Sequence, residues 1–414
     1  MKIVMFTDSY WPRVNGVTVS VEAFANTLLK RGHDVLIVCP LYPGYTGTEA
    51  FSLNTEKKDH AIPESCILRV PSIPLMLSQE DRLTKSHKLF WVKRKIDTFA
   101  PDIIHVHSEF VMADFGFFCA RVRKIPAIYT FHTLWEEYMK NYVPYVPVFI
   151  LNFLLKIILG TSLKRAFRII VPGQETLEVA QKYKIKREPY LLPTGINPDI
   201  FTHSEEEIAI FKRKMEIKYP KIVDKNILLY AGRIGKEKNI EFLVKIAPKI
   251  LKKHSNVIFL IVGNGPDLYG FQDACEEAGV LNDFIFTGYM DRKDLALTYA
   301  ISKIFVFPSL TETQGLVTIE SMTCGIPVVA IGARGTLTVM AGDNGGFMVK
   351  NDAEEFSKRV FDLLEDQELY KKKSAEAKEY SKKWTIDIMT DRLEKIYADA
   401  IGDYKKKATR KRLF

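Results

Sequence analysis

Short apolar runs alternate with longer amphipathic segments along the whole chain. The runs are nearly continuous in valine, isoleucine and phenylalanine, as expected of parallel strands whose sheet is covered on both faces. The expected strands are residues 2–8, 34–40, 103–107, 127–131, 168–172, 226–232, 257–263, 284–288, 303–308 and 327–330. Helical segments such as Val17–Arg31 and Ala113–Arg123 separate them. This alternation predicts βαβ units and mostly parallel sheets.

The βα alternation occurs as two successive series, and the second begins near residue 226. A chain of 414 residues is also too long for one ordinary core. We therefore expect two doubly wound α/β domains, residues 1–195 and 196–385, joined by the segment Pro193–Pro198, which contains proline and glycine. Ligands of open α/β sheets bind beyond the carboxyl ends of the strands, so the cleft between the domains is the expected active site.

Composition narrows the class of protein. Hydrophobic residues make up 47% and charged residues 26%, which is typical of a globular chain. The net charge of +9 favours anionic partners, such as nucleotides, phosphates, an acidic bilayer or nucleic acid, although solubility alone also explains it. No nucleic-acid-binding module is recognised. The five cysteines are scattered without a Cys-x-x-Cys pair, which favours a reducing compartment over a disulfide framework or a zinc site.

Neither a signal peptide nor a membrane-spanning helix is expected. The amino-terminal residues KIVMFTD read as a strand and lack a basic region followed by a long apolar stretch. The most apolar window, Val143–Gly160, is interrupted by two prolines, Asn152 and Lys156. It therefore lacks the run of about eighteen apolar residues that a spanning helix needs.

The segment TETQGLVTIES carries two glutamates, Glu312 and Glu320, eight positions apart. A helix is expected to begin near Leu316 or Val317, after a turn at Gly315. The unpaired amides at such a helix start form an anion site that suits a diphosphate, and glycine allows its close approach. Carboxylates suit sugar hydroxyls because each accepts several hydrogen bonds. Alternatively, both glutamates only complement the helix dipole.

A second polar cluster, GRIGKEKN at residues 232–239, follows an expected strand and opens a helix. Arg233 and Lys238 would project near the carboxyl end of that strand. Paired cations at this position neutralise a pyrophosphate leaving group as its charge develops. The alternative is an exposed basic loop, which is less favourable because cations oppose the dipole at a helix start.

Taken together, these motifs resemble those of family 4 of the retaining glycosyltransferases, and the resemblance covers nearly the whole chain. Its glutamate pair corresponds to Glu312 and Glu320, and its arginine and lysine correspond to Arg233 and Lys238. The strand-end motif is Gly263–Pro266. The resemblance implies the GT-B fold, in which two Rossmann-like doubly wound domains face a cleft. It also implies that the carboxyl-terminal helix, residues 386–404, packs back on the first domain.

The resemblance further implies a nucleotide-sugar donor, retention at the anomeric carbon, and catalysis without a metal or other cofactor. Glu312 would contact the transferred sugar as a catalytic residue, and Glu320 would hold the ribose. The diphosphate would be held by Arg233, Lys238, Gly315 and the backbone at Leu316 and Val317. The departing phosphate would itself take the proton of the acceptor hydroxyl.

Four further positions follow from the resemblance. The base would lie near Gly263 and Tyr289. Gly16 matches the glycine that lets the donor phosphate come close, although Asn15-Gly16 replaces the usual two glycines. His132, the second expected catalytic residue, lies at the carboxyl end of an expected strand, where it can donate to a sugar hydroxyl or accept a proton.

The other histidines near that edge, His105 and His107, are expected to pack or to support the site rather than to contact the donor. A loop histidine without a function is the alternative for His132 itself.

The acceptor is expected to be a membrane lipid. Arg82–Ile96 reads as a basic, partly amphipathic helix of the kind that lies in an anionic interface, and Val146–Leu159 is unusually apolar. The residues TETQGL and YTFHT resemble glucosyl- and galactosyl-diacylglycerol synthases and, more distantly, phosphatidylinositol mannosyltransferases. These features favour a UDP-sugar donor, a diacylglycerol-type acceptor and a cytoplasmic, peripheral membrane enzyme.

Several alternatives remain open at this stage. GDP-mannose or a soluble sugar acceptor would suit the same fold, as would a nucleotide-sugar epimerase or a non-catalytic binding module. The basic tail KKKATRKRLF is expected to be a frayed, solvated end, with a membrane contact as the second interpretation.

Overall fold

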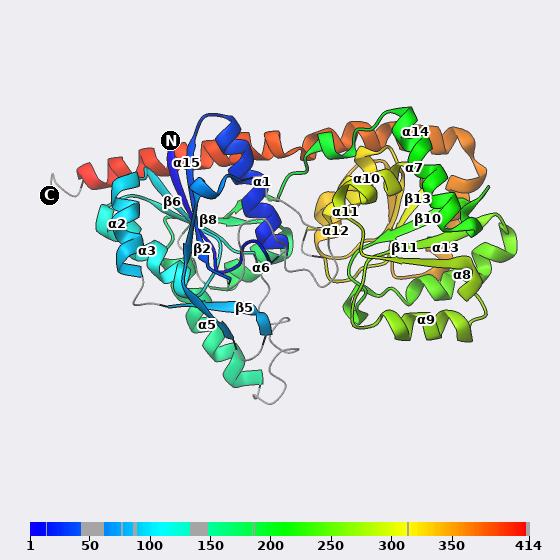
Figure 1. Ribbon diagram of the computed structural model, residues 1–414, viewed down its shortest axis with the longest axis horizontal. Coiled ribbons are helices and arrows are strands. Elements are labelled where there is room, and N and C mark those ends of the chain that lie inside the picture. The colour runs from blue at the N-terminus through cyan, green and yellow to red at the C-terminus, as the bar shows by residue number, and fades with distance from the viewer. Residues whose placement is uncertain are drawn as a thin grey trace. The chain divides into compact units, whose positions relative to one another are not determined.

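The computed structural model describes residues 1–13, 15–42, 62–75, 78–85, 89–132, 148–183, 185, 187–312 and 314–410 (Figure 1). The chain divides into two compact units. The first contains Met1–Gly195 together with Ile386–Phe414, and the second contains Ile196–Thr385.

The first unit is built on a seven-stranded sheet with the order β3-β2-β1-β6-β7-β8-β9, in which every pair is parallel. A separate antiparallel hairpin joins β4 to β5. The strands are β1 (Lys2–Phe6), β2 (Asp34–Pro40), β3 (Ile67–Val70), β4 (Ser72–Leu75), β5 (Ser78–Thr84), β6 (Ile103–Val106), β7 (Ala127–Thr130), β8 (Arg168–Val171) and β9 (Tyr190–Leu191).

Helices flank this sheet, and the carboxyl-terminal helix α15 lies against α1 (Figure 1). Arg31 at the end of α1 forms ion pairs with Asp387, Asp391 and Glu394 of α15. The helices are α1 (Gly16–Lys30), α2 (Leu89–Phe99), α3 (Val111–Arg123), α5 (Val148–Arg165), α6 (Gln174–Lys182) and α15 (Ile386–Arg410), with the 3-10 helix η1 (Glu64–Cys66). Residues distant in sequence thus complete one unit.

The second unit contains a six-stranded parallel sheet with the order β12-β11-β10-β13-β14-β15. Its strands are β10 (Asn226–Ala231), β11 (Val257–Val262), β12 (Phe284–Gly288), β13 (Ile304–Phe307), β14 (Val328–Ile331) and β15 (Gly346–Val349). Its helices are α7 (Glu205–Lys218), α8 (Phe242–Lys253), α9 (Leu268–Glu277), α10 (Arg292–Ala300), α11 (Leu316–Thr323), α12 (Gly335–Val339), α13 (Ala353–Glu365) and α14 (Gln367–Ser381). The 3-10 helices are η3 (Pro198–Phe201), η4 (Pro220–Ile222), η5 (Lys236–Lys238), η6 (Leu281–Asp283) and η7 (Lys382–Trp384).

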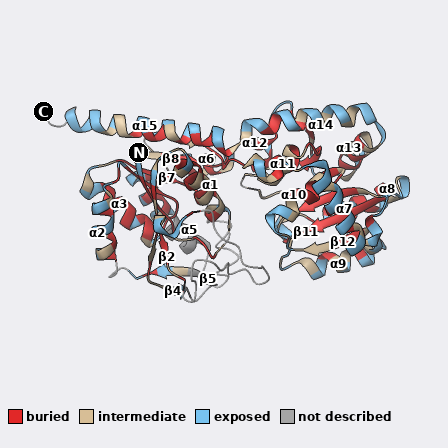
Figure 2. Cartoon of the chain, turned by 45° about the horizontal axis from the view of Figure 1, so that its top comes forward, coloured by how far each residue is buried: buried red, intermediate tan, exposed pale blue. Residues whose placement is uncertain are grey.

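Each sheet is the centre of its own apolar core (Figure 2). Every residue of β11, β13 and β14 is buried, whereas the outer faces of the helices are exposed. Continuous apolar strands therefore reflect a sheet that is covered on both sides. This architecture confirms the prediction of two doubly wound α/β domains with parallel sheets.

The predicted helix over Arg82–Ile96 is wrong in its first part. Arg82 belongs to β5, where its guanidinium donates to the hydroxyl and the carbonyl oxygen of Ser72 on β4. The helix in this region is α2, which begins at Leu89. Pairing with β4 determines the strand, and a sequence window cannot report that pairing.

The end of the chain also differs from expectation. Helix α15 continues to Arg410, so most of the basic tail is helical rather than frayed. The apolar stretch Val146–Leu159 forms the first part of α5 from Val148 onward, but residues 146–147 and the side chains of 148–155 lie outside the described residues. None of the described helices is both long and apolar enough to cross a bilayer.

Candidate functional site

The polar segments singled out in the second unit follow neighbouring parallel strands. Gly232 and Arg233 follow β10, Gly263 follows β11, and the loop with Glu312 follows β13. Strand β10 pairs with both β11 and β13, and all three are parallel. Their carboxyl ends therefore meet at one edge of the sheet, which is where α/β folds bind ligands.

The side chains of Lys238 and Glu312 form an ion pair at this edge. The distance from Lys238 Nζ to Glu312 Oε1 is 2.7 Å, and the two side chains are 18% and 22% exposed. Two further hydrogen bonds hold the loop with Glu312: its carbonyl oxygen accepts from the Gly335 amide, and the Thr311 hydroxyl donates to the Glu237 carbonyl oxygen. A carboxylate and an ammonium group are thus fixed together where little water reaches them.

Arg233 forms a separate ion pair. Its guanidinium is 63% exposed and contacts Glu237 at 3.1 Å, whereas its carbonyl oxygen accepts from the Tyr230 hydroxyl. An exposed ion pair of this spacing contributes only about 0.3–0.5 kcal/mol. The side chain of Arg233 is therefore held weakly, and an anionic ligand can replace Glu237 as its partner.

Helix α11 begins at Leu316, as predicted, and Gly315 is its N-terminal cap. Gly315 has a φ of 66°, a left-handed conformation that residues with a side chain rarely adopt. The amides of Leu316 and Val317, the first residues of the helix, have no partner within it. They form the positive end of the helix dipole beside the Lys238–Glu312 pair, which favours an anion.

Glu320 lies further along α11 and is held by two residues of α10. The Tyr299 hydroxyl donates to Oε2 at 3.2 Å, and Arg292 lies 3.5 Å from Oε1. Burial raises the pKa of Glu320 above its ordinary value. Sequence reasoning missed Tyr299 and Arg292, although their spacing of two helical turns places them on one face of α10.

The glycines after β11 are required by backbone packing. A side chain at Gly263 would place its Cβ 1.9 Å from the Gly232 carbonyl oxygen, and one at Gly265 would place it 2.0 Å from the Ile234 carbonyl oxygen. The loops after β10 and β11 therefore lie directly against each other. The Gly263 amide also donates to the Gly288 carbonyl oxygen, which brings the exposed Tyr289 close to the same loop.

In the first unit, Gly16 is the first residue of α1 and Asn15 is its N-terminal cap. Asn15 Oδ1 accepts from the Thr18 amide, and its Nδ2 donates to the Ser9 hydroxyl. A Cβ added to Gly16 would meet nothing within 4 Å. Internal packing therefore does not require this glycine, and the backbone there is open to a ligand.

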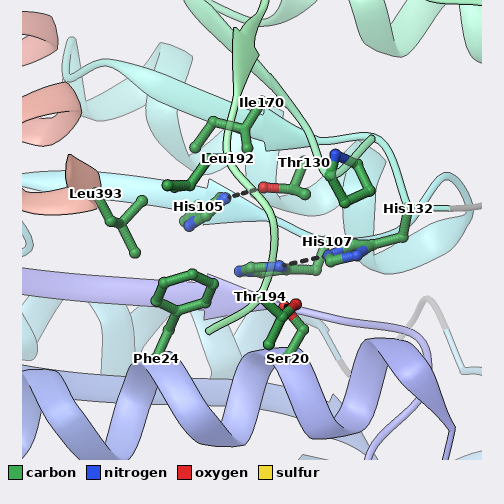
Figure 3. Close-up of a pocket in the computed structure, with 11 residues that line it drawn as sticks. Ser20, Phe24, His105, His107, Thr130, His132, Ile170, Leu192, Thr194 and Leu393 are labelled. Carbon is green, nitrogen blue, oxygen red and sulfur yellow. Dashed lines mark hydrogen bonds between the residues drawn. The ribbon is translucent and has the colours of Figure 1, made fainter. Parts of the chain in front are cut away.

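His132 follows β7 and contacts His107, which follows the neighbouring strand β6. His107 Nδ1 and His132 Nε2 are 3.1 Å apart, and the two rings are stacked with centroids 5.4 Å apart (Figure 3). Burial lowers the pKa of His132 to about 4 and that of His107 well below its ordinary value. Both imidazoles are therefore neutral at pH 7.

These histidines border a small cavity of about 10 Å³ inside the first unit (Figure 3). It is lined by His105, His107 and His132, by the hydroxyls of Ser20, Thr130 and Thr194, and by Phe24, Ile170, Pro172, Leu192 and Leu393. His105 makes hydrogen bonds with Thr130 on β7 and Tyr397 on α15, each at 2.6 Å, and burial lowers its pKa to about 3.

Asp8, just after β1, was missed by sequence reasoning. Its carboxylate accepts from the amides of Phe110 and Met112 at the start of α3. Burial raises its pKa to about 6, although these hydrogen bonds oppose the shift. The signal was an acid directly after a buried strand, which places a titratable group at the ligand-binding edge of the sheet.

Comparisons with known proteins match both halves of the chain to family models. Residues 14–200 match a model described as Glycosyltransferase Family 4, and residues 211–384 match one described as Glycosyl transferases group 1. Together the two models account for most of the chain.

Two curated proteins are similar to this chain in sequence over most of its length. An alpha-monoglucosyldiacylglycerol synthase from Streptococcus pneumoniae is 30% identical over 336 residues, which span 80% of this chain and 71% of that protein. One from Acholeplasma laidlawii is 27% identical over 423 residues, which span 99% of this chain and 100% of the relative. The chain is also similar in structure to Anabaena Alr3699/HepE, whose crystal structure was determined in complex with UDP and glucose. The similarity spans 96% of this chain and 100% of that chain, with 15% sequence identity and a TM-score of 0.71.

Proposed function

Because this chain belongs to family 4 of the glycosyltransferases and has the GT-B fold, we propose that it transfers a hexose from a UDP-sugar to a diacylglycerol-type membrane lipid, with retention at the anomeric carbon. The proposed donor site rests mainly on the Lys238–Glu312 ion pair near the start of α11. The names of the two synthases support the choice of acceptor.

The donor diphosphate is proposed to bind at the start of α11. The amides of Leu316 and Val317 supply donors, and Lys238 neutralises the charge that develops as the diphosphate leaves. Arg233 is exposed and weakly paired with Glu237, so it can turn to the phosphates at small cost. These groups supply the positive charge that a metal ion provides in other transferases, so the reaction is proposed to be metal-independent.

The two glutamates take separate roles in this proposal. Glu312, held by Lys238, accepts hydrogen bonds from the hydroxyls of the transferred sugar. Glu320, held by Tyr299, binds the ribose. The base lies near Gly263 and the exposed Tyr289.

Gly16 and His132 are the donor contacts proposed for the first unit. The open backbone at Gly16 suits the approach of a phosphate, and His132 is a polar group beyond the end of β7.

The chemical step needs no nucleophile from the protein. The hydroxyl oxygen of the acceptor bonds to the anomeric carbon as the bond from that carbon to the diphosphate oxygen breaks. The departing diphosphate takes the hydroxyl proton, so the products are the glycolipid and UDP. Attack on the face from which the diphosphate leaves accounts for retention, and Lys238 stabilises the charge on the leaving group.

Exposed aromatic and basic side chains on α2 and α3 of the first unit support a lipid acceptor. Phe90 on α2 is 74% exposed, and Phe118 on α3 is 49% exposed. An ion pair between Arg123 and Asp97 joins these helices, which lie side by side (Figures 1 and 2). Exposed basic residues on or next to them are Arg94, Lys95, Arg121 and Lys124. Aromatic and basic side chains together favour an anionic bilayer surface.

The decisive experiment incubates the full chain with UDP-glucose, UDP-galactose or GDP-mannose and vesicles containing diacylglycerol, and identifies products by mass spectrometry. The expected product is a monohexosyl-diacylglycerol in the α configuration that forms with a UDP-sugar and in the presence of a chelator. Transfer only from GDP-mannose, transfer only to a soluble sugar, or a changed sugar with the donor alone would each replace the proposal with the corresponding alternative.

Vesicle flotation tests the membrane surface separately. We expect the chain to float with vesicles that contain anionic lipid and to be released at high salt, because basic side chains supply part of the attraction. Replacing Phe90 and Phe118 by serine is expected to reduce flotation without changing the binding of UDP. Flotation of this variant equal to that of the original chain would contradict the assignment of this surface.

A further inference from the structure

His132, the donor contact proposed for the first unit, is held by a second histidine. We propose that His107 is a positioning residue that keeps the proton of His132 on Nδ1, so that His132 donates a hydrogen bond to an oxygen of the sugar donor and does not act as a base. This inference rests on the donor-site role of His132 in the proposed function. It assigns His107 a role in orienting the proton of the neighbouring ring.

The geometry requires one proton between the two rings. His107 Nδ1 and His132 Nε2 are 3.1 Å apart, which is a hydrogen-bond distance. Burial keeps both rings neutral at pH 7, so each carries a single N–H. Either His107 donates and His132 carries its proton on Nδ1, or His132 donates through Nε2 and has a bare Nδ1.

The other nitrogen of His107 favours the first arrangement. His107 Nε2 is buried and has no hydrogen-bond partner among the described residues. If His132 donated, this nitrogen would carry a buried N–H without an acceptor, and the large majority of buried side-chain polar atoms in folded proteins have a hydrogen-bond partner. If His107 donates, the same nitrogen is an acceptor. The cavity wall then requires no unpaired N–H.

The titratable groups of the cavity point to the same arrangement. Of the described residues that line the cavity, only His105, His107 and His132 are titratable, so no carboxylate draws a proton to His107 Nε2.

His105 fixes the ring of His107 without competing for its nitrogens. The two ring centroids are 3.9 Å apart, so the rings lie against each other. Both nitrogens of His105 already have hydroxyl partners, Tyr397 at Nδ1 and Thr130 at Nε2. The His107 ring is thus confined by its neighbours, and its Nδ1 stays directed at His132 (Figure 3).

A fixed Nδ1–H determines which ligand atoms His132 can bind. It can donate to a hydroxyl or ring oxygen of a sugar, but it has no free lone pair with which to take a proton. His132 therefore does not take the acceptor proton, in keeping with the proposed transfer of that proton to the departing diphosphate. This conclusion decides between the two roles that the sequence left open for His132.

Two polar substitutions at position 107 test the inference. In His107→Asn the side-chain amide can take the place of Nδ1 and still donate, whereas in His107→Gln the amide takes the place of Nε2. We expect His107→Gln to lower turnover of UDP-glucose by about tenfold and His107→Asn to retain most of it. Thermal unfolding of both variants shows whether they fold. Equal losses in the two would overturn the positioning role.

Nitrogen-15 correlation spectra of the full chain, labelled at its eight histidines, report the tautomers directly. The signals of His132 are identified by their loss in His132→Ala. We expect an Nδ1-protonated ring in the original chain and in His107→Asn, and an Nε2-protonated ring in His107→Gln. An Nε2-protonated or charged His132 in the original chain at pH 7 would overturn the inference.

The two measurements separate this inference from the proposed function. Full turnover in His132→Ala would remove His132 from the donor site and so overturn the catalytic part of both proposals. The spectra would still decide the tautomer in that case, because they require neither substrate nor activity.

Discussion

At the scale of single residues, the Lys238–Glu312 ion pair dominates the candidate site. Both side chains are largely buried, so removing one leaves the other without compensation for its lost hydration. The same two groups are proposed to contact the leaving diphosphate and the transferred sugar. Loss of either should therefore lower both the stability of the fold and the rate of turnover.

We predict that Glu312→Ala and Lys238→Ala each reduce turnover at least tenfold, which corresponds to about 1.4 kcal/mol of transition-state stabilisation. Initial rates with UDP-glucose and diacylglycerol vesicles provide the measurement. Lys236→Ala is the matched control, because this exposed lysine lies on the same 3-10 helix and should leave the rate unchanged. Rates within twofold of the original in both variants would remove the pair from the site.

A second residue-scale prediction concerns Tyr299. Tyr299→Phe removes the hydrogen bond to Glu320 Oε2 and leaves the ring in its buried position. A hydrogen bond of this kind contributes about 1 kcal/mol net, so its loss should weaken the binding of UDP roughly fivefold. The value of kcat should change little. Calorimetric titration with UDP measures this change. An unchanged Kd together with a lower kcat would contradict the assignment of Glu320 to the ribose.

The candidate site residues of the second unit could be predicted from the sequence because their motifs lie within short segments. The structure brings two of them, Lys238 and Glu312, into contact. The sequence alone could not identify the side chains that hold the site residues in place. Tyr299 precedes Glu320 by a strand and a loop, and His107 reaches His132 from the neighbouring strand. Such contacts depend on the order of strands in the sheet, which a single segment does not encode.

At the scale of elements, the closely packed loops after β10 and β11 give a test of the fold. Gly265→Ala would place Cβ 2.0 Å from the Ile234 carbonyl oxygen, so one loop must move. We expect a loss of roughly 2 kcal/mol and a lower midpoint of thermal unfolding by about 4–8 °C.

The matched control for Gly265→Ala is Gly270→Ala. Gly270 lies in α9 with nothing within 4 Å of an added Cβ, so alanine there should stabilise the helix by about 0.5–1 kcal/mol. Similar midpoints for the two variants would mean that the loops do not pack as closely as described.

The expected strands of both sheets agree with the structure to within two residues at each end, because continuous apolar runs and buried parallel strands are physically linked. The hairpin of β4 and β5 was missed for the opposite reason. Its sequences, SIPL and SQEDRLT, carry proline and charges, and their strand conformation depends on pairing with each other. Arg82 therefore appeared helical until its partner strand was known.

At the scale of the whole molecule, the buried titratable groups of the first unit make its stability depend on pH. The pKa of His105 is lowered to about 3 and that of His132 to about 4, whereas an unfolded histidine titrates near 6.5. Below pH 6.5 the unfolded chain binds more protons than the folded chain. The free energy of unfolding therefore falls as the pH decreases towards 4, by up to about 1.4 kcal/mol per pH unit for each histidine.

Asp8 acts in the opposite direction, because its pKa is raised to about 6. Between about pH 4 and 6 the folded chain keeps this proton while the unfolded chain has lost it, so Asp8 offsets the effect of one histidine. Urea unfolding at pH 7 and 5.5 should show lower stability at pH 5.5, and His132→Asn should reduce the difference. Greater stability at pH 5.5 than at pH 7 would contradict the assigned protonation states.

The division of the chain at Gly195 and Thr385 has a consequence for biosynthesis. The second unit is one continuous segment whose ends are joined, since the Ile196 amide donates to the Trp384 carbonyl oxygen. All of its residues are translated before helix α15 of the first unit. The first unit still lacks the partner of His105, because Tyr397 is translated after the whole of the second unit. The amino-terminal part of the first unit therefore cannot complete its fold until α15 has been synthesised. We expect this part of the chain to depend most on chaperones during synthesis.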